Sequence, residues 1–441
     1  MRSCAALSLA AGGAPLFNIQ VRAAEADLPF ATGNEKINKA RAVGMGILKP
    51  TPGELEHGLR LHAESLVFES YGFAPRAAVD GGAFQAAVEA GASDSELIDL
   101  REEMSMTRWA TDERERREFL EAFRASGVTG IFQNAGEEGN DPLRLIKRLA
   151  RFTYSTDLLR DEVFKAVKPD DVVVAKKQQK FCLYFSGNGV PLRQQWSTPR
   201  DELGFVRIFH RLGIRMMHLT YNRRNPLGDG CGELNDGGLS DFGRRAVEEM
   251  NRIGVIVDVA HSGWRTGREA AKASKKPVVA SHTVAGELNP HIRSKPDETI
   301  RAICDTGGLV GICCISNFLG GTGDLNAMLD HLVYVVKKFG AEHAGIGTDI
   351  VYVSRNDDAE QAKVPKRADG RSPLGTPGVR WEHLWPGTNS TRERPELQSG
   401  LSWTNWPLFT VGMVQRGLKD EDIRKILGEN VLRVVRANFV T

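Results

Sequence analysis

Two histidines each end an apolar run of the sequence: His261 follows Val255–Ala260, and His282 follows Pro277–Ala280. Short runs rich in valine are typical of strands buried in a parallel sheet. Asp349 follows a third such run, in "AGIGTDIVY". Neutral imidazole and carboxylate both ligate zinc-like ions, and three such ligands leave one position open for a catalytic water. The three residues therefore predict a catalytic metal site; the alternative is that a backbone carbonyl satisfies each histidine.

A fourth candidate, Arg293, lies in "NPHIRSKPDE", in the loop expected after the strand that ends at His282. A guanidinium group forms two parallel hydrogen bonds to a carboxylate. Arg293 is therefore the candidate to bind a carboxylate of the substrate. The alternative is an ordinary surface arginine in a polar loop.

The elements that must position these residues are short apolar runs that alternate with amphipathic stretches. The stretches, such as "SDFGRRAVEEMNRIG" and "LNAMLDHLVYVVKKFG", begin near Ser, Asp or Asn and end in Gly or Lys, as helix capping requires. The apolar runs are residues 65–68, 128–132, 181–185, 214–219, 255–260, 278–280, 309–315 and 344–346.

Strands that alternate with helices indicate βαβ units and a parallel sheet. Eight strands match an α/β fold of the TIM (β/α)8 barrel type. A doubly wound sheet is the alternative, but no Gly-x-Gly-x-x-Gly follows any of the runs. In a TIM barrel the active site lies where the strands end, so His261, His282 and Asp349 would meet there.

We expect one barrel domain over residues 34–441, with two segments that break the alternation. Residues 76–126 form a helical insertion after the first strand, and their charge pairs suggest a solvated surface. Residues 351–400 form a long polar loop after the eighth strand, of the kind that often acts as a lid or binding loop. This loop carries three aromatic rings that either wall a pocket or pin the loop to the surface: Trp381, His383 and Trp385.

Composition excludes several classes of protein. The 441 residues include 41% hydrophobic and 26% charged side chains, which is ordinary for a globular protein. A formal charge of +2 offers no electrostatic case for nucleic acid or an anionic membrane as a partner. No run of about 18 apolar residues is present, so we expect no transmembrane segment. The six cysteines form no CxxC pair, and small buried side chains are their simplest role.

Residues 1–33 differ from the rest of the chain. They begin with "MRSCAALSLAAGGAPLF", in which one arginine precedes a short run of small apolar residues. Such a segment is similar to the end of a bacterial export signal. We therefore expect a signal or flexible lead-in and an exported, periplasmic protein, with a cytoplasmic location as the alternative.

Four segments in order resemble the membrane (renal) dipeptidase family: "GLSDFGRRAVEEMNRIGVIVDVAHSG", "PVVASHTVAGELNPHIRSKPDETIRAI", "GIGTDI" and "LFTVGMVQRGLKDEDIRKILGENVLRVV". The resemblance implies a TIM barrel of the metal-dependent hydrolase kind, with two zinc ions, a small peptide-like substrate and often a homodimer. It implies that His261 and His282 ligate zinc. It also implies that Arg293 binds the C-terminal carboxylate of the substrate, and that Asp349 accepts and donates the proton at the scissile bond.

The chain departs from that family at the ends of the first and third strands. The family's His-x-Asp pair falls on Tyr71 and Phe73, and neither a phenol nor a benzyl ring replaces such zinc ligands. Its bridging glutamate falls in "LYFSGNGVPL", which offers Ser186, Gly187 and Asn188 but no carboxylate. The ligands of one metal are therefore missing while those of the other remain, and we expect one zinc ion rather than two.

A third departure lies at the end of the fourth strand, where the family's histidine falls on Tyr221 in "MMHLTY". A phenol can donate a hydrogen bond to a developing oxyanion, so Tyr221 joins Asp349 as a catalytic candidate. His218 precedes Tyr221 by three residues and is expected to face the opposite way on a strand of period two.

These observations favour a metallohydrolase that cleaves a dipeptide, or a similar small amide with a free carboxylate. One alternative is a barrel without catalysis that binds a small carboxylate ligand or a partner, which the missing ligands favour. Another is a barrel that acts on a different amide or on a lactone.

Overall fold

Eight parallel strands form a nearly closed barrel in the computed structural model, which describes residues 30–136, 141–364, 366 and 395–439. The expected TIM-type α/β barrel is confirmed, since a strand of the barrel lies at or beside each of the eight apolar runs. In barrel order the strands are β1 (Phe68–Gly72), β2 (Gly130–Asn134), β4 (Phe181–Gly187), β5 (Ile214–His218), β6 (Ile256–Asp258), β7 (Val278–Ala285), β9 (Leu309–Ile312) and β10 (Ala344–Ile346). Two short strands lie outside this order: β3 (Val163–Lys165) pairs with β4, and β8 (Ser294–Lys295) pairs with β7.

The barrel is joined between β1 and β10 by side chains rather than by a ladder. One carboxylate oxygen of Glu69 accepts a hydrogen bond from the backbone N of Thr348, at 2.9 Å, and another from the Thr348 hydroxyl. The other oxygen accepts a hydrogen bond of 2.7 Å from Nε1 of Trp403. The backbone N of Asp349 lies 3.5 Å from the carbonyl oxygen of Tyr71. The end of the last strand is therefore held beside the end of the first.

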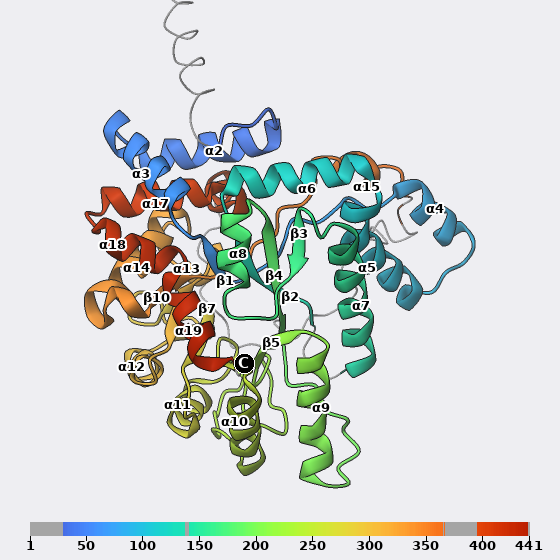
Figure 1. The fold of residues 1–441 in the computed structure, drawn as a ribbon, viewed down its shortest axis with the longest axis vertical. Helices are drawn as coiled ribbons and strands as arrows, with labels where there is room; N and C mark the ends of the chain where they lie inside the picture. The colour runs from blue at the N-terminus through green and yellow to red at the C-terminus, as the bar shows by residue number, and fades with distance from the viewer. Residues whose placement is uncertain (1–29, 137–140, 365, 367–394, 440–441) are drawn as a thin grey trace, which may run out of the picture.

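Helices cover the outside of the barrel, and α2, α3 and α17 pack together at one end of it, at the top of Figure 1. The longer helices are α2 (Glu35–Leu48), α3 (Pro52–Glu64), α4 (Gly81–Glu89), α5 (Asp94–Thr111), α6 (Glu113–Ser126), α7 (Pro142–Leu158), α9 (Pro199–Arg211), α10 (Asp241–Ile253), α11 (Trp264–Ala273), α12 (Asp297–Asp305), α14 (Leu325–Phe339), α17 (Trp406–Gln415) and α19 (Asn430–Asn438). The shorter ones are α8 (Asp171–Lys177), α13 (Ser316–Leu319), α15 (Asp357–Gln361), α16 (Pro395–Gln398) and α18 (Asp420–Arg424).

Helix α10 shows how the sequence sets the element before each strand. The hydroxyl of Ser240 accepts a hydrogen bond of 2.9 Å from the backbone N of Gly243, which caps the start of the helix. At the other end Gly254 adopts a φ of 86°, a left-handed conformation that favours glycine. Ala246, Val247 and Met250 are buried at helical spacing against the barrel. The cap and the stop together fix where β6 begins.

Strand β1 begins later than the apolar run at residues 65–68 predicts. Ser65 ends α3 instead: its backbone N donates to the carbonyl oxygen of Leu61 at 3.1 Å, and its hydroxyl donates to the same oxygen at 2.6 Å. The strand proper therefore starts at Phe68 and runs into the segment that carries Tyr71.

Residues 76–126 hold α4, α5 and α6, but a solvated surface is the wrong expectation for three of their glutamates. Glu102, Glu115 and Glu118 are buried. Each has a partner: Arg148 contacts Glu102 at 2.9 Å, the backbone N of Ala78 donates to Glu115 at 2.9 Å, and other donors surround Glu118. Burying an unpaired carboxylate costs several kcal/mol, so these charges are buried only because other groups satisfy them.

No helix in the described part of the chain is long and apolar enough to cross a membrane. The loop residues Trp381, His383 and Trp385 lie outside the described residues.

Candidate metal and active site

The two strand-end histidines meet inside the barrel mouth. His261 follows β6, His282 lies in the adjacent β7, and both side chains are buried. Their Nε2 atoms lie 2.9 Å apart, and the centroids of their rings are 4.9 Å apart. Neighbouring parallel strands bring these nitrogens to one point, as their positions in the sequence predict.

Neighbouring side chains determine which nitrogen of each imidazole carries a proton. Nδ1 of His261 lies 2.7 Å from the amide oxygen of Asn222, which can only accept a hydrogen bond. Nδ1 of His282 lies 2.8 Å from the hydroxyl of Ser281, and that hydroxyl donates its single proton to Asp258. Both Nδ1 atoms therefore carry a proton, and both Nε2 atoms present lone pairs to each other.

Two nitrogen lone pairs at this distance repel each other unless a cation lies between them. Burial lowers the pKa of His261 and His282 well below 6.5, and the positive charge of Arg293 lowers both further. A shared proton is therefore disfavoured at neutral pH. Histidines that ligate a metal usually donate their other N–H to an oxygen, which is the arrangement here. The pair fits a metal ion.

Asp258 organises this arrangement from the end of β6. Its Oδ1 accepts hydrogen bonds from the backbone N atoms of Ala260, at 2.9 Å, and Ser281, at 3.1 Å. Its Oδ2 accepts the Ser281 hydroxyl and lies 2.7 Å from Nε2 of His218. Burial by itself raises the pKa of Asp258, but the charge of His218 and these hydrogen bonds bring it below its ordinary value. The carboxylate is therefore ionised, and Ser281 must donate to it.

The expectation that His218 faces away from the site is wrong. Its side chain is fully buried, with its ring centroid 5.0 Å from that of His261 and 5.3 Å from that of His282. Strand β5 ends at His218, so the alternation of a strand does not extend to Tyr221 three residues later. Ligand atoms of His218, Asp258 and His282 lie within 4.8 Å of one another. Both oxygens of Asp258 already accept hydrogen bonds, so we interpret this cluster as one that orients the His282 ring through Ser281.

Arg293 is buried, with 3% of its surface exposed, and its Nε and Nη2 have no hydrogen-bond partner among the described residues. Its guanidinium carbon lies 5.1 Å from the centre of the Phe318 ring. A buried donor without a partner costs about 1–3 kcal/mol, more when it is charged. Such an arginine is suited to an anionic ligand, so the surface alternative for Arg293 is excluded by its burial.

Asp349 lies at the barrel mouth after β10, partly exposed, in a left-handed conformation with φ 56°. Non-glycine residues adopt such a conformation rarely, and mostly where the surrounding structure imposes it. Burial of its carboxyl group raises the pKa of Asp349 to about 6, while the charges of Arg293 and His218 act in the opposite direction. Asp349 therefore lies within electrostatic range of the arginine and the histidine cluster.

A tyrosine ring stacks on the imidazole of each of the two converging histidines. Tyr221 stacks on His261 with 4.0 Å between centroids, and Tyr71 stacks on His282 with 3.9 Å between centroids. The Tyr71 hydroxyl donates a hydrogen bond of 2.7 Å to the side-chain oxygen of Asn188 at the end of β4. Burial raises the pKa of Tyr71 well above 10, so its hydroxyl stays neutral. The ends of β1 and β4 thus hold a neutral, hydrogen-bonded pair of side chains.

A cleft of about 460 Å³ opens beside Tyr221. Tyr221, Asn188 and Asn134 line it from the strand ends. Residues of α5, α7 and α15 form the rest of its wall, so the insertion after β1 and the start of the long loop after β10 both contribute to it. Small-molecule sites typically enclose about 300–1,000 Å³.

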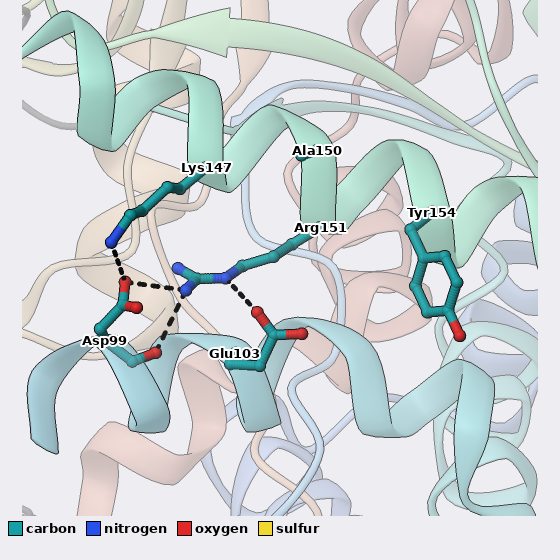
Figure 2. A pocket seen from close by; sticks show the side chains of 6 residues that line it. All are labelled: Asp99, Glu103, Lys147, Ala150, Arg151 and Tyr154. Carbon is teal, nitrogen blue, oxygen red and sulfur yellow. Dashed lines mark hydrogen bonds and ion pairs between the residues drawn. The ribbon is translucent and has the colours of Figure 1, made fainter. Parts of the chain in front are cut away.

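A second hollow, of about 320 Å³, lies on the outside between α5 and α7 (Figure 2). Its charged groups bond to one another: Arg151 contacts Asp99 at 2.8 Å and Glu103 at 2.6 Å, and Lys147 contacts Asp99 at 3.2 Å. It shares no described lining residue with the cleft. The hollow is therefore the surface of an ion-pair network that locks two helices together.

Fold and site together define a TIM-barrel protein with converging buried histidines at its strand ends. Known proteins place it more closely: the model of membrane dipeptidases, peptidase family M19, matches residues 98–361. Dipeptidase tcpJ from Claviceps purpurea is 28% identical over 286 residues, which are 64% of this chain and 56% of the fungal protein. The chain belongs to the membrane dipeptidase family.

Solved structures from Pseudomonas aeruginosa are also similar to this chain. An amidohydrolase is 26% identical with a TM-score of 0.61, covering 87% of this chain and 99% of that one. The probable dipeptidase PvdM is 20% identical with a TM-score of 0.60, covering 88% of this chain and 99% of that one. The second likeness supports the fold alone, whereas membership of family M19, together with the converging nitrogens, indicates a metal site.

Sequence reasoning missed three supporting residues. Asp258 could have been found, because it is a single charge inside the apolar run "VIVDVA". Ser281 adjoins His282 but carries no signal of its own, and Asn222 lies 39 residues before its histidine partner. Only the fold brings these groups to the Nδ1 atoms.

Proposed function

We propose that the chain is a metal-dependent hydrolase of dipeptides, or of similar small amides with a free carboxylate, that works with one zinc ion. The observation that carries this proposal is the pair of Nε2 atoms 2.9 Å apart, each with its Nδ1 proton committed to an oxygen. Nitrogen ligands at a barrel mouth suit zinc. Family M19 and the dipeptidase relatives support the reaction class.

His261, His282 and Asp349 are the residues that would hold the ion, and zinc when bound supplies Lewis acidity for hydrolysis. Arg293 binds the substrate carboxylate with its unpaired Nε and Nη2. Tyr221, on the surface of the cleft, donates a hydrogen bond to the oxyanion that forms as the amide is cleaved. Asp349 carries the proton at the scissile bond when it is not engaged as a ligand.

A single ion is favoured by the side chains on the opposite side of the mouth. Tyr71 and Asn188 bond to each other, and Phe73 offers no ligand atom. Neutral groups that satisfy one another have little affinity for a second divalent cation.

The test is metal analysis of the purified protein, followed by a dipeptide panel assayed with and without chelator. We expect about one zinc per chain and hydrolysis that chelator abolishes and zinc restores. Absence of any stoichiometric transition metal would contradict the proposal. His261→Ala separates catalysis from binding alone. Loss of turnover in this variant would exclude a barrel that only binds. A carboxylate ligand that binds equally to both proteins, with turnover in neither, would make the barrel a binding protein.

We also propose a homodimer, on the strength of family membership alone. Light scattering at micromolar concentration checks it, and a monomeric mass would exclude it.

A further inference from the structure

Guanidinium groups outnumber carboxylates along the described lining of the 460 Å³ cleft. The arginines there are Arg76, Arg101, Arg144 and Arg148, and the acids are Glu102 and Asp357. We propose that this cleft binds an acidic side chain on the amino-terminal residue of the substrate, so that the protein prefers glutamyl and aspartyl dipeptides. This inference rests on the proposed function and names its substrate class.

The position of the cleft decides which part of a substrate reaches it. Tyr221, which stacks on His261, and Asn188, which is bonded to Tyr71, both line it. Arg293 is not among its lining residues and is proposed to hold the carboxyl end. With the scissile amide at the histidine pair and the carboxyl end at Arg293, the amino-terminal residue is the part that extends into the cleft.

The wall made by α5 and α7 carries an excess of positive charge among the described residues. The carboxylate of Glu102 is shared by three guanidinium groups: Arg144 at 2.5 Å, Arg148 at 2.9 Å and Arg151 at 3.3 Å. Arg151 also pairs with Asp99 and Glu103 on the outside of these helices. Within the cleft lining, Arg144 and Arg148 are therefore opposed by the single charge of Glu102, and this excess favours a further anion. Glu102 is itself buried, so water screens this field weakly.

The arginines are also held in place before any ligand arrives. Nε of Arg148 donates a hydrogen bond of 2.9 Å to the carbonyl oxygen of Ala135, directly after β2. The guanidinium of Arg76 lies 4.9 Å from the centre of the Phe73 ring, and its backbone N bonds to the carbonyl oxygen of Tyr352 at 2.8 Å. All four cleft arginines already have interactions in the protein, so a ligand joins an existing network. Side chains fixed in this way lose little entropy on binding.

An acidic side chain suits this cleft better than a basic or an aliphatic one. A carboxylate accepts two parallel hydrogen bonds from a guanidinium group, whereas a lysyl side chain meets like charges. The polar wall also gives an aliphatic side chain little to pack against, because Ser105, Asn134, Gln361 and the arginines make up much of it.

The experiment measures binding by calorimetry, with isosteres in which a methylene group replaces the scissile N–H. The zinc-loaded protein receives the Glu-Ala, Gln-Ala and Lys-Ala isosteres, of which the first two differ in one charge. We expect the Glu form to bind about tenfold tighter than the Gln form, and the Lys form to bind most weakly. The isosteres are not cleaved, so the outcome stands whether or not the protein hydrolyses dipeptides.

The variants are Arg76→Gln and Arg101→Gln, singly and together, with Arg117→Gln as the matched control. Arg117 is exposed on α6, pairs with Glu113, and does not line the cleft. The double variant should bind the Glu and Gln forms about equally, with its affinity for the Gln form unchanged, which shows that the fold is intact. Equal binding of the two forms by the unmodified protein, no binding of either form, or a Glu preference that survives in the double variant overturns the proposal.

Discussion

The two sides of the barrel mouth differ sharply in chemistry. On the side of β5, β6 and β7, three buried histidines lie together, and Asn222, Ser281 and Asp258 satisfy the backs of the rings. On the side of β1, β2 and β4, the strand ends carry aromatic and amide side chains, and arginines line the cleft above them. Strands of the same barrel form both sides, so the two sides differ in their side chains rather than in their architecture.

That difference shows which side of the mouth has groups that orient imidazole rings. A metal ligand is useful only if the atoms behind it orient it, and on the β5–β7 side those atoms are all present. On the β1–β4 side the hydrogen bond between Tyr71 and Asn188 leaves both groups neutral and satisfied. We propose that the first side binds a cation and that the second binds the organic part of a ligand.

Removing one imidazole of the converging pair should have the largest effect on the difference between the two sides. His261→Ala or His282→Ala takes away one of the two converging nitrogens, so we expect loss of bound metal and a fall in kcat/KM of at least about a thousandfold. Metal analysis and dipeptide kinetics measure both effects. His57→Ala serves as the control, because His57 is partly exposed on α3 and pairs with Asp420. Full metal content in either site variant would show that the pair is not the metal site.

Arg293→Met should have the next largest effect. It removes the buried guanidinium whose charge acts on His261 and His282, and we expect KM for a dipeptide to rise about a hundredfold while kcat falls less. The same dipeptide with an amidated C-terminus should be indifferent to the change. An equal effect on both substrates would mean that Arg293 does not bind the carboxylate.

A change behind His261 should act more weakly. Asn222 has a φ of 53°, which glycine adopts freely, so Asn222→Gly removes the amide oxygen without straining the backbone. We expect about a 10–100-fold loss of metal affinity, measured by chelator competition. Asn222→Asp keeps an acceptor at that place and should retain most of the affinity; an aspartate variant as weak as the glycine variant would refute the role of the oxygen.

The smallest effect on the histidine site is expected from Glu69, where β1 meets β10, because its change concerns stability instead. Burial raises the pKa of Glu69 from 4.5 to about 8, against hydrogen bonds from Thr348 and Trp403 that lower it. Between these two values the unfolded chain has released a proton that the folded chain retains. The free energy of unfolding therefore falls as pH rises, by at most about 1.4 kcal/mol per pH unit.

Glu69→Gln removes this contribution. The Tm of the variant relative to that of the unmodified protein should therefore rise between about pH 5 and pH 8, as thermal unfolding at several pH values would show. A difference in Tm that stays constant over this range would mean that Glu69 is ionised in the folded protein throughout.

Much of the fold could be predicted from the sequence, because its signals are local. Each strand is a short valine- and isoleucine-rich run, and helix α10 carries its own cap at Ser240 and its own stop at Gly254. The boundary of β1 was less predictable, since the side chain of Ser65 bonds back to the preceding helix. The burial of Glu102 was not predictable either, because its three arginine partners lie on a helix more than 40 residues away.

The sequence by itself determined that His261 and His282 end adjacent parallel strands, because chain order and strand period decide which residues reach the barrel mouth. Only the tertiary structure decided that their Nε2 atoms face each other as lone pairs, that His218 turns inward to Asp258, and that arginines from the insertion line the cleft. The reason is physical. A strand end is a local property of the chain, whereas the proton on an imidazole and the field in a cleft depend on groups that only folding brings within a few ångströms.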